Sequence, residues 1–304
     1  MRSWQSYLMN GISRLVFKRQ DVRSKSVAEL REMFDKNMSR GYRPPAGVQH
    51  TPAELGGVPG IWTERGGEAT TLLYFHGGGY IIGSASGYRE FAARLSAACG
   101  ARVFAADYRL APEHPHPAAL DDATACYRAL LASGVDPERL VVAGDSAGGG
   151  LTLATLMALR DVGDPLPAAA VCLSPWTDLT GSGESVRSNA RADPMITPQA
   201  LEFMAGHYAP GQDLTAPALS PVFGNLAGLP PMLLLVGDTE ILRDDASRVA
   251  EAARAAGGEV RYEAWRGMPH VWPTFARFLP EGRAAVAQIG EFVRARVGEV
   301  ARAA

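Results

Sequence analysis

The stretch VVAGDSAGGG, residues 141–150, places a serine between an apolar run and a run of glycines. The apolar residues 140–143 predict a strand, and the pattern over 151–159 predicts a helix directly after it. Between them, GDSAG matches G-x-S-x-G, a sharp strand-to-helix turn that exposes its serine. Gly144 and Gly148 lack the Cβ atoms that would clash beside such a turn. We therefore predict that Ser146 is a nucleophile at a helix N-terminus, where the helix dipole favours developing negative charge.

Short apolar strands alternate with helical patterns on both sides of this stretch, from residue 70 onward. Such alternation is typical of βαβ units and of a mostly parallel sheet. Residues 46–64 differ, because Gly56 and Gly57 separate two short extended runs, which predicts an antiparallel hairpin at the sheet edge. The expected strands are 70–75, 102–107, 139–143, 168–173, 232–237 and 259–265, and the expected helices are 87–99, 118–132, 147–161, 243–256 and 284–303.

Two segments do not follow this alternation. Residues 1–45 read as helical before the sheet begins, and residues 181–215 are inserted where the alternation expects a single helix. The insert contains the helical run 198–208. Because neither segment is needed to complete a sheet, we assign both to a cap on a single domain that spans residues 1–304.

The first of these segments carries an apolar stripe. Trp4, Leu8, Ile12, Leu15 and Val16 recur at near-helical spacing, which indicates an amphipathic helix. We expect the stripe to pack over the protein's own domain. The alternative is a helix that lies on a membrane surface.

A serine nucleophile needs a general base, and the base needs an acid that orients it. Of the six histidines, only His207 and His270 follow Ser146 in the chain. His207 lies in the cap insert, whereas His270 lies in the loop after the strand 259–265, at the sheet edge where open α/β sheets carry their sites. The acid is expected in the loop after the strand 232–237, where Asp238 and Glu240 are both candidates that strand parity does not separate.

A second glycine-rich stretch, HGGG at 76–79, directly follows the strand 70–75. Acyl transfer by a serine passes through a tetrahedral oxyanion, which needs backbone N–H donors aimed at it. Gly78 and Gly79 let bare backbone approach the substrate, and Ala147, the residue after the nucleophile, supplies a further donor. We predict that these three residues form an oxyanion hole.

HGGG and GDSAGG together resemble the motifs of the bacterial hormone-sensitive-lipase-like family of esterases. Further similar stretches are DYRLAPEHP at 107–115, LSP at 219–221, GLPP at 228–231 and EILRD at 240–244. The resemblance runs from about residue 70 to the C-terminus. It implies an α/β-hydrolase fold with a mostly parallel eight-stranded sheet flanked by helices, a helical cap, and hydrolysis of carboxylic esters without a cofactor.

The resemblance also implies roles for single residues. The family's acid pattern D/E-x-L-x-D falls on Glu240, although Asp is the commoner residue there, so Asp238 stays as the alternative. His76 resembles the histidine that braces the oxyanion loop, and Asp145 is interpreted as a hydrogen-bond brace under the serine turn. Bulky side chains of the cap are candidates for the acyl pocket: Phe34, Met195, Ile196, Met204 and Tyr208.

Composition and motifs argue against nucleic acid, nucleotides and metal ions as ligands. The net charge of −2, from 30 basic and 32 acidic residues, gives no electrostatic footprint for nucleic acid. No G-x-x-x-x-G-K-[ST] phosphate loop is present. His114 and His116 lie among prolines without an apparent third ligand, so we expect no metal and no cofactor. A small-molecule ester is the expected partner, and a homodimer is compatible with the sequence.

Cysteine usage and hydropathy bear on the compartment. The three cysteines, at positions 99, 126 and 172, form no CxxC pair and lie in apolar patterns, as buried reduced thiols do. Such thiols favour the cytoplasm. No apolar stretch reaches the roughly 18 residues that span a bilayer, so no stable membrane association is expected.

Together these observations predict a serine carboxylesterase that acts on short- to medium-chain esters, with an optimum of four to eight acyl carbons implied by the family. One alternative is a lipase that acts on longer acyl chains. Another is a catalytically inactive ligand-binding protein on the same fold, although such proteins are expected to have lost a member of the triad.

Overall fold

A computed structural model describes residues 2–19, 21–38, 42 and 44–303. Its centre is an eight-stranded sheet in the order β1-β2-β4-β3-β5-β6-β7-β8. β1 and β2 pair antiparallel, β2 pairs antiparallel with β4, and all other neighbours are parallel. The strands are β1 (Gln49–Leu55), β2 (Val58–Glu64), β3 (Thr70–Phe75), β4 (Ala101–Ala106), β5 (Leu140–Asp145), β6 (Ala169–Leu173), β7 (Met232–Gly237) and β8 (Val260–Trp265).

Burial explains why the parallel strands were readable in the sequence. Every residue of β3, β5, β6 and β7 is buried, as expected for parallel strands covered on both faces. The predicted edge hairpin is confirmed, with Leu55 paired to Val58 across Gly56 and Gly57. Both glycines have positive φ, which a two-residue hairpin turn of this kind requires.

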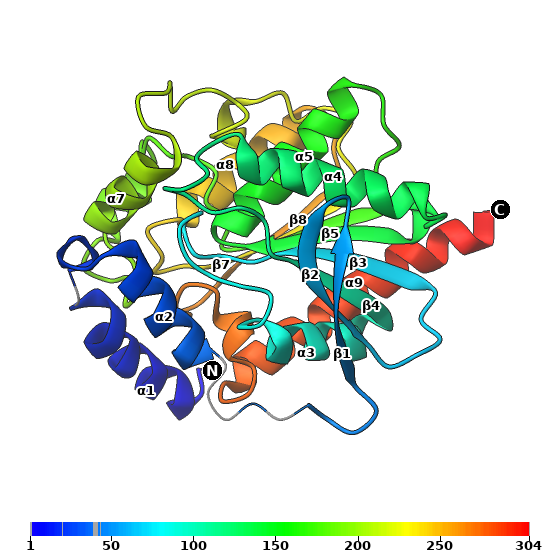
Figure 1. The fold of residues 1–304 in the computed structure, drawn as a ribbon. Helices are drawn as coiled ribbons and strands as arrows, with labels where there is room; N and C mark the ends of the chain where they lie inside the picture. The colour runs from blue at the N-terminus through cyan, green and yellow to red at the C-terminus, as the bar shows by residue number, and fades with distance from the viewer. Residues whose placement is uncertain (1, 20, 39–41, 43, 304) are drawn as a thin grey trace.

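Helices cover both faces of the sheet (Figure 1). α3 and α9 lie against one face, and α4, α5 and α8 lie against the other. α4, α5 and α7 have the predicted bounds, whereas α9 begins at Pro280, four residues before the prediction. The helices are α1 (Trp4–Ser13), α2 (Val27–Met38), α3 (Arg89–Cys99), α4 (Ala118–Ala132), α5 (Ala147–Asp161), α6 (Glu184–Ser188), α7 (Pro198–Tyr208), α8 (Arg243–Ala255) and α9 (Pro280–Ala303).

The segments assigned to the cap lie together on one side of the molecule, where α1 and α2 are neighbours of α7 (Figure 1). A π-helical turn, Arg14–Lys18, and a 3-10 turn, Val22–Ser24, connect α1 to α2. Residues 1, 20, 39–41 and 43 of the predicted cap lie outside the described residues. The division into a cap and a core stays a prediction.

The orientation of α1 corrects one expectation. The helix does contact the protein's own domain, but not through its apolar stripe, since Trp4 is 70% and Leu8 is 54% exposed. Ser6 and Ser13 are buried instead. Hydrogen bonds explain the orientation, because the body of the protein offers polar partners to this helix, such as the Gly267 carbonyl that accepts from Asn10 Nδ2 at 3.0 Å.

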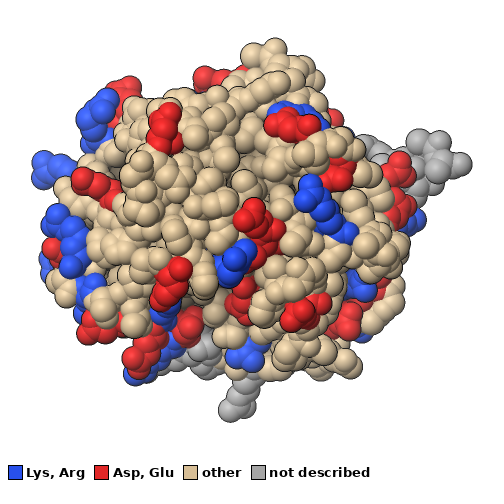
Figure 2. Space-filling model, turned by 45° about the horizontal axis from the view of Figure 1, so that its top comes forward, with Lys and Arg blue, Asp and Glu red and all other residues tan. Residues whose placement is uncertain are grey.

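The distribution of surface charge and the state of the cysteines agree with the expectations from composition. On the face shown in Figure 2, Lys and Arg side chains alternate with Asp and Glu and form no continuous basic patch. Cys99, Cys126 and Cys172 are buried and free. Among the described residues, no helix combines the length and the apolar character that crossing a bilayer requires.

Candidate active site

The turn between β5 and α5 holds Ser146 in a strained conformation, with φ 52° and ψ −121°. A Cβ atom at Gly144 would overlap the Gly148 carbonyl, and one at Gly148 would overlap the Phe75 carbonyl. The turn therefore requires both glycines. The Ser146 N–H donates to the Leu173 carbonyl at 2.8 Å, which ties the turn to β6.

His270 and Glu240 form a buried pair in two neighbouring loops, after β8 and β7. Nδ1 of His270 lies 2.7 Å from Oε2 of Glu240, and the two side chains are 4% and 0% exposed. The other oxygen of the carboxylate, Oε1, accepts from the Gly237 N–H at 2.5 Å and from Ser174 Oγ at 2.8 Å. The carboxylate is thus fixed from three sides and aimed at the imidazole.

The electrostatics of this pair favour a basic imidazole. Burial alone would lower the pKa of His270, but the hydrogen bond and the charge of Glu240 outweigh burial and raise that pKa above its ordinary value. Burial raises the pKa of Glu240, and the hydrogen bond and charge of His270 offset part of that rise. A proton on the imidazole is therefore stabilised by the carboxylate beside it.

Asp238, the other candidate acid, has a different partner. Its Oδ1 accepts from the Gly267 N–H at 2.6 Å, three residues before His270 in the sequence. Asp238 therefore holds the backbone of the loop that carries the histidine. The imidazole itself is bonded to Glu240.

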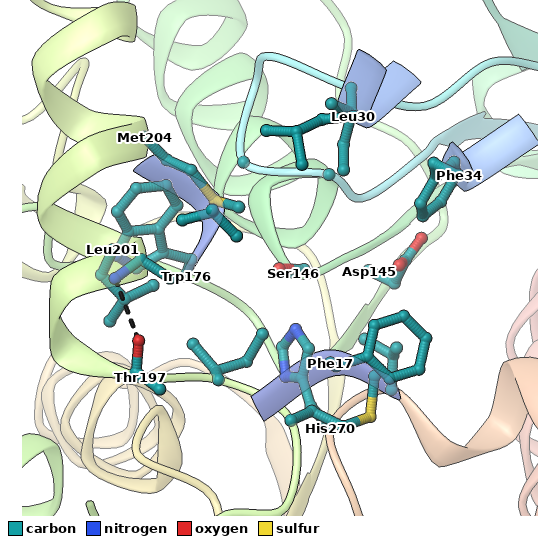
Figure 3. Close-up of a pocket in the computed structure, with 18 of the residues that line it drawn as sticks. Phe17, Leu30, Phe34, Asp145, Ser146, Trp176, Thr197, Leu201, Met204 and His270 are labelled. Carbon is teal, nitrogen blue, oxygen red and sulfur yellow. Dashed lines mark hydrogen bonds between the residues drawn. The ribbon is translucent and has the colours of Figure 1, made fainter. Parts of the chain in front are cut away.

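Ser146 and His270 line the same cavity. Figure 3 shows the imidazole pointing toward Ser146. Ser146 Oγ and the imidazole, both described, form no hydrogen bond with each other in this structure. Catalytic hydrogen bonds are often long in unliganded enzymes and tighten when substrate binds.

The loop after β3 brings Gly78 and Gly79 to this cavity. Their φ values are 120° and 61°, in the region that favours glycine. Across the described chain, the N–H groups of Gly78, Gly79 and Ala147 have no acceptor. Ala147 is the first residue of α5. Donors without acceptors beside a half-buried serine that lines the cavity suit an incoming oxyanion.

Asp145 and His76 bond to the backbone and side chains around this loop. Oδ1 of Asp145 accepts from the Gly77 N–H at 3.0 Å and from the Tyr74 hydroxyl at 2.6 Å. Its Oδ2 accepts from the Tyr88 hydroxyl at 2.8 Å. His76 bonds the Gly77 carbonyl through Nδ1 at 2.8 Å, and burial lowers its pKa. Both side chains thus lie against the oxyanion loop, and their bracing role stays a prediction.

The cavity is enclosed by the two segments assigned to the cap, with Phe17, Leu30 and Phe34 from the first and Leu201 and Met204 from α7 (Figure 3). Its volume is about 180 Å³. The other lining residues are Val16, Val22, Met33, Asn37, Gly78, Gly79, Ile82, Tyr88, Asp145, Ser146, Trp176, Met195, Ile196, Thr197, Ala200, Leu242, His270 and Val271.

Four of the five predicted acyl-pocket residues therefore line this cavity: Phe34, Met195, Ile196 and Met204. Tyr208 does not, which corrects the prediction for this residue. Its ring stacks on Tyr80 with centroids 3.7 Å apart and lies 1% exposed. An aromatic partner on the core side of α7 turns the ring away from the cavity.

Three residues that hold Glu240 and the histidine loop in place were not predicted from the sequence. Ser174 links Glu240 to the histidine loop, since its Oγ donates to Oε1 and accepts from the Val271 N–H at 3.1 Å. Asp193 accepts from the Ile241 N–H at 2.9 Å, and Asn189 donates to the Glu240 carbonyl at 2.8 Å. Asp193 and Asn189 come from the inserted segment, so that segment also holds the acid in place.

His116 and His207 lie outside the cavity and bond to other groups of the protein. His116 Nδ1 lies 3.1 Å from Oε1 of Gln212, and His207 Nδ1 lies 2.8 Å from the Phe203 carbonyl. In the part of the chain that the structure describes, no group of three or more His, Cys, Asp or Glu side chains is arranged to hold a metal ion.

The fold and this arrangement of serine, histidine and acid define an α/β-hydrolase. Residues 72–274 match the family described as alpha/beta hydrolase fold. A crystal structure of an esterase from the bacterial hormone-sensitive lipase (HSL) family superimposes with a TM-score of 0.93 and 41% identity, over 98% of this chain and 99% of that one. The chain belongs to the α/β-hydrolase family and, within it, to the bacterial hormone-sensitive-lipase type of esterases.

Two curated relatives agree with this assignment. An acetyl-hydrolase of Streptomyces hygroscopicus is 47% identical over 232 residues, which cover 76% of this chain and 78% of the relative. An esterase of Acinetobacter venetianus is 33% identical over 295 residues, which cover 95% of this chain and 96% of the relative. The predicted fold and family are thereby confirmed.

Proposed function

We propose that this carboxylic ester hydrolase works through an acyl-enzyme on Ser146, with His270 as general base and Glu240 as the acid that orients it. The observation that carries the proposal is the strained serine at the N-terminus of α5, in one cavity with an imidazole that Glu240 holds at 2.7 Å. Nucleophile, base, orienting acid and backbone donors are the parts that acyl transfer requires.

The reaction follows from the positions of these groups. As Ser146 Oγ attacks the ester carbonyl, its proton passes to Nε2 of His270, and the oxyanion is bound by the N–H groups of Gly78, Gly79 and Ala147. The carbon–oxygen bond to the alcohol then breaks, and the alcohol leaves with the proton from His270. Water attacks the acyl-enzyme in the same way and gives the free acid and the free serine.

The size and lining of the cavity support short to medium acyl chains, with an optimum of four to eight carbons. Its volume of about 180 Å³ is close to the roughly 150 Å³ of an apolar cavity that binds one benzene ring. Hydrophobic side chains from both cap segments form most of its wall. A relative that is named acetyl-hydrolase supports a short acyl group as well.

Ser146→Ala tests the proposal, with Ser96→Ala as a matched control. Ser96 is a buried serine, its hydroxyl has no partner among the described residues, and it lies on α3 away from the cavity. We expect Ser146→Ala to lower kcat for a p-nitrophenyl ester by on the order of 10⁴-fold or more, and Ser96→Ala to keep it. A folded Ser146→Ala protein with near-normal turnover would overturn the proposal.

The cytoplasm is the compartment that we propose. Three free and buried thiols support a reducing compartment, because disulfides are rare in the cytosol. Cell fractionation with an antibody against the chain tests this assignment. Recovery of most of the protein from the medium would contradict it.

A further inference from the structure

The first helix presents its apolar side to solvent. Within α1, Trp4 is 70%, Tyr7 is 62%, Leu8 is 54% and Ile12 is 45% exposed, and Leu15, one turn further, is 59% exposed. These residues are three or four positions apart and so lie along one face of the helix. Exposed apolar patches of this kind mark sites of interaction with another surface.

The opposite, polar side of α1 attaches the helix to the protein. Ser3 donates through its backbone N–H and its hydroxyl to the two carboxylate oxygens of Glu281, at 2.6 and 2.7 Å. Asn10 donates to Gly267, and Ser6 and Ser13 are buried. Because these bonds fix the polar side inward, the apolar face is held outward and is available without any rearrangement.

Basic side chains lie beside the apolar face. Arg14, Lys18, Arg19 and Arg191 line a surface depression together with Gly11 and Leu15, and no acidic residue lines it among those described. Residues 2–25 contain six basic residues and one acidic residue, whereas the whole chain has a net charge of −2. This segment therefore carries a net charge of +5, and the rest of the chain carries −7.

We propose that the apolar face of α1 and its basic rim form a docking surface for an anionic phospholipid bilayer. Amphipathic helices with aromatic and aliphatic residues beside Lys and Arg bind in the interfacial plane of membranes. Anionic lipids attract such a rim. A helix of 10 residues lies on the bilayer and cannot cross it, so binding is reversible.

Charge disfavours a second copy of the chain as the occupant. A two-fold dimer would place this face against itself, since such interfaces use the same patch on both subunits. Such a dimer would bring two copies of this net-positive segment into one interface, and like charges across an interface repel. A negatively charged phospholipid headgroup would instead attract the basic residues of this segment.

The docking surface adjoins the active-site cavity. Val16 and Phe17, in the turn that follows α1, line that cavity together with Ser146. Docking through α1 would therefore bring the cap side of the cavity close to the bilayer. Membrane-bound esters would gain access, although the docking itself does not depend on the catalytic proposal.

Vesicle binding of the full chain tests the inference. The vesicles consist of phosphatidylcholine alone, or of phosphatidylcholine and phosphatidylglycerol in equal parts. Of the five tryptophans, all in the described part of the chain, Trp4 alone is among the exposed large hydrophobic residues. We expect binding to anionic vesicles at least about ten-fold tighter than to neutral ones, weaker binding at high salt, and a blue shift of tryptophan emission.

Three variants assign the binding to this surface. Leu8→Ser/Ile12→Ser should weaken binding by about ten-fold or more, and Arg19→Gln/Arg191→Gln should lower the preference for anionic vesicles several-fold. Trp4→Phe should bind but lose the emission shift. Val162→Ser is the control, because Val162 is 65% exposed at the far end of α5. All variants should hydrolyse a soluble short ester at the wild-type rate.

Three results would overturn the inference. The wild type could fail to bind either kind of vesicle. Binding could persist unchanged in Leu8→Ser/Ile12→Ser, which would place it on another surface. Finally, sedimentation velocity could reveal a dimer that Leu8→Ser/Ile12→Ser dissociates, in which case the face belongs to a second copy of the chain.

Discussion

Asp238 and Glu240 lie two residues apart and hold two different parts of the same loop. Asp238 accepts from the backbone N–H of Gly267 at 2.6 Å, whereas Glu240 contacts Nδ1 of His270 at 2.7 Å. The first carboxylate thus fixes the backbone that leads to the histidine, and the second fixes the imidazole. Their effects on catalysis should differ accordingly.

Glu240→Gln should lower kcat by roughly 10³–10⁴-fold, because an amide does not stabilise the imidazolium and favours the wrong tautomer. Asp238→Asn should cost less than about ten-fold in kcat, because its amide oxygen still accepts from Gly267. Steady-state kinetics on one p-nitrophenyl ester checks both changes. The reverse order of effects would assign the acid to Asp238.

The pH profile should report the pKa of His270. The base acts only when neutral, and Glu240 raises its pKa above the ordinary value despite burial. In the wild type, kcat/KM should therefore fall as the pH drops through a value above roughly 6.5. In Glu240→Gln, the hydrogen bond and charge of Glu240 no longer oppose burial, so the acid limb of the residual activity should move to lower pH. An unshifted limb would show that another group titrates.

Replacing Gly78 or Gly79 by alanine should lower kcat, but only the loss at Gly79 should be partly restored by a second substitution. A Cβ atom at Gly78 would overlap the backbone carbonyl of Ile82, whereas one at Gly79 would overlap the side chain of Met204. Gly78→Ala should lower kcat by about 10²-fold or more. Gly79→Ala should lose less kcat in a Met204→Ala background than in the wild type, which a double-mutant cycle measures. Additive losses would show that Met204 does not restrict this loop.

Tyr74 should act as a positioning residue for the oxyanion loop. Its hydroxyl donates to Asp145, which in turn accepts from the Gly77 N–H. Tyr74→Phe should lower kcat about ten-fold with little change in KM, because a shifted donor affects the transition state rather than substrate binding. Tyr127→Phe is the control, since its buried hydroxyl donates to Pro165 on another part of the molecule. Equal effects of the two variants would indicate a loss of packing alone.

The sequence predicted best what depends on buried, regular structure. The fully buried parallel strands were visible as apolar runs, and the turn around Ser146 was visible because its geometry demands Gly144 and Gly148. Asp193 and Ser174 were not found, because their roles depend on bonds to Ile241 and Glu240 that are distant in the sequence. An isolated serine or aspartate carries no local pattern.

The apolar stripe of α1 and the ring of Tyr208 were misplaced for a related reason. Periodicity shows that Leu8 and Trp4 share a face, but it does not show which face meets the protein. Here the polar partners Glu281 and Gly267 decided the orientation. Tyr208 likewise follows its stacking partner Tyr80, which sequence spacing does not reveal.

Covalent trapping tests the central claim most directly. The wild type is mixed with an excess of a p-nitrophenyl phosphonate, which leaves a stable adduct on a nucleophilic serine, and its intact mass and digested peptides are measured. The account predicts one adduct per chain, located on Ser146, with a burst of p-nitrophenol of the same stoichiometry. Normal ester hydrolysis by protein that carries the adduct on Ser146, or an adduct on another residue that accounts for the burst, would contradict it.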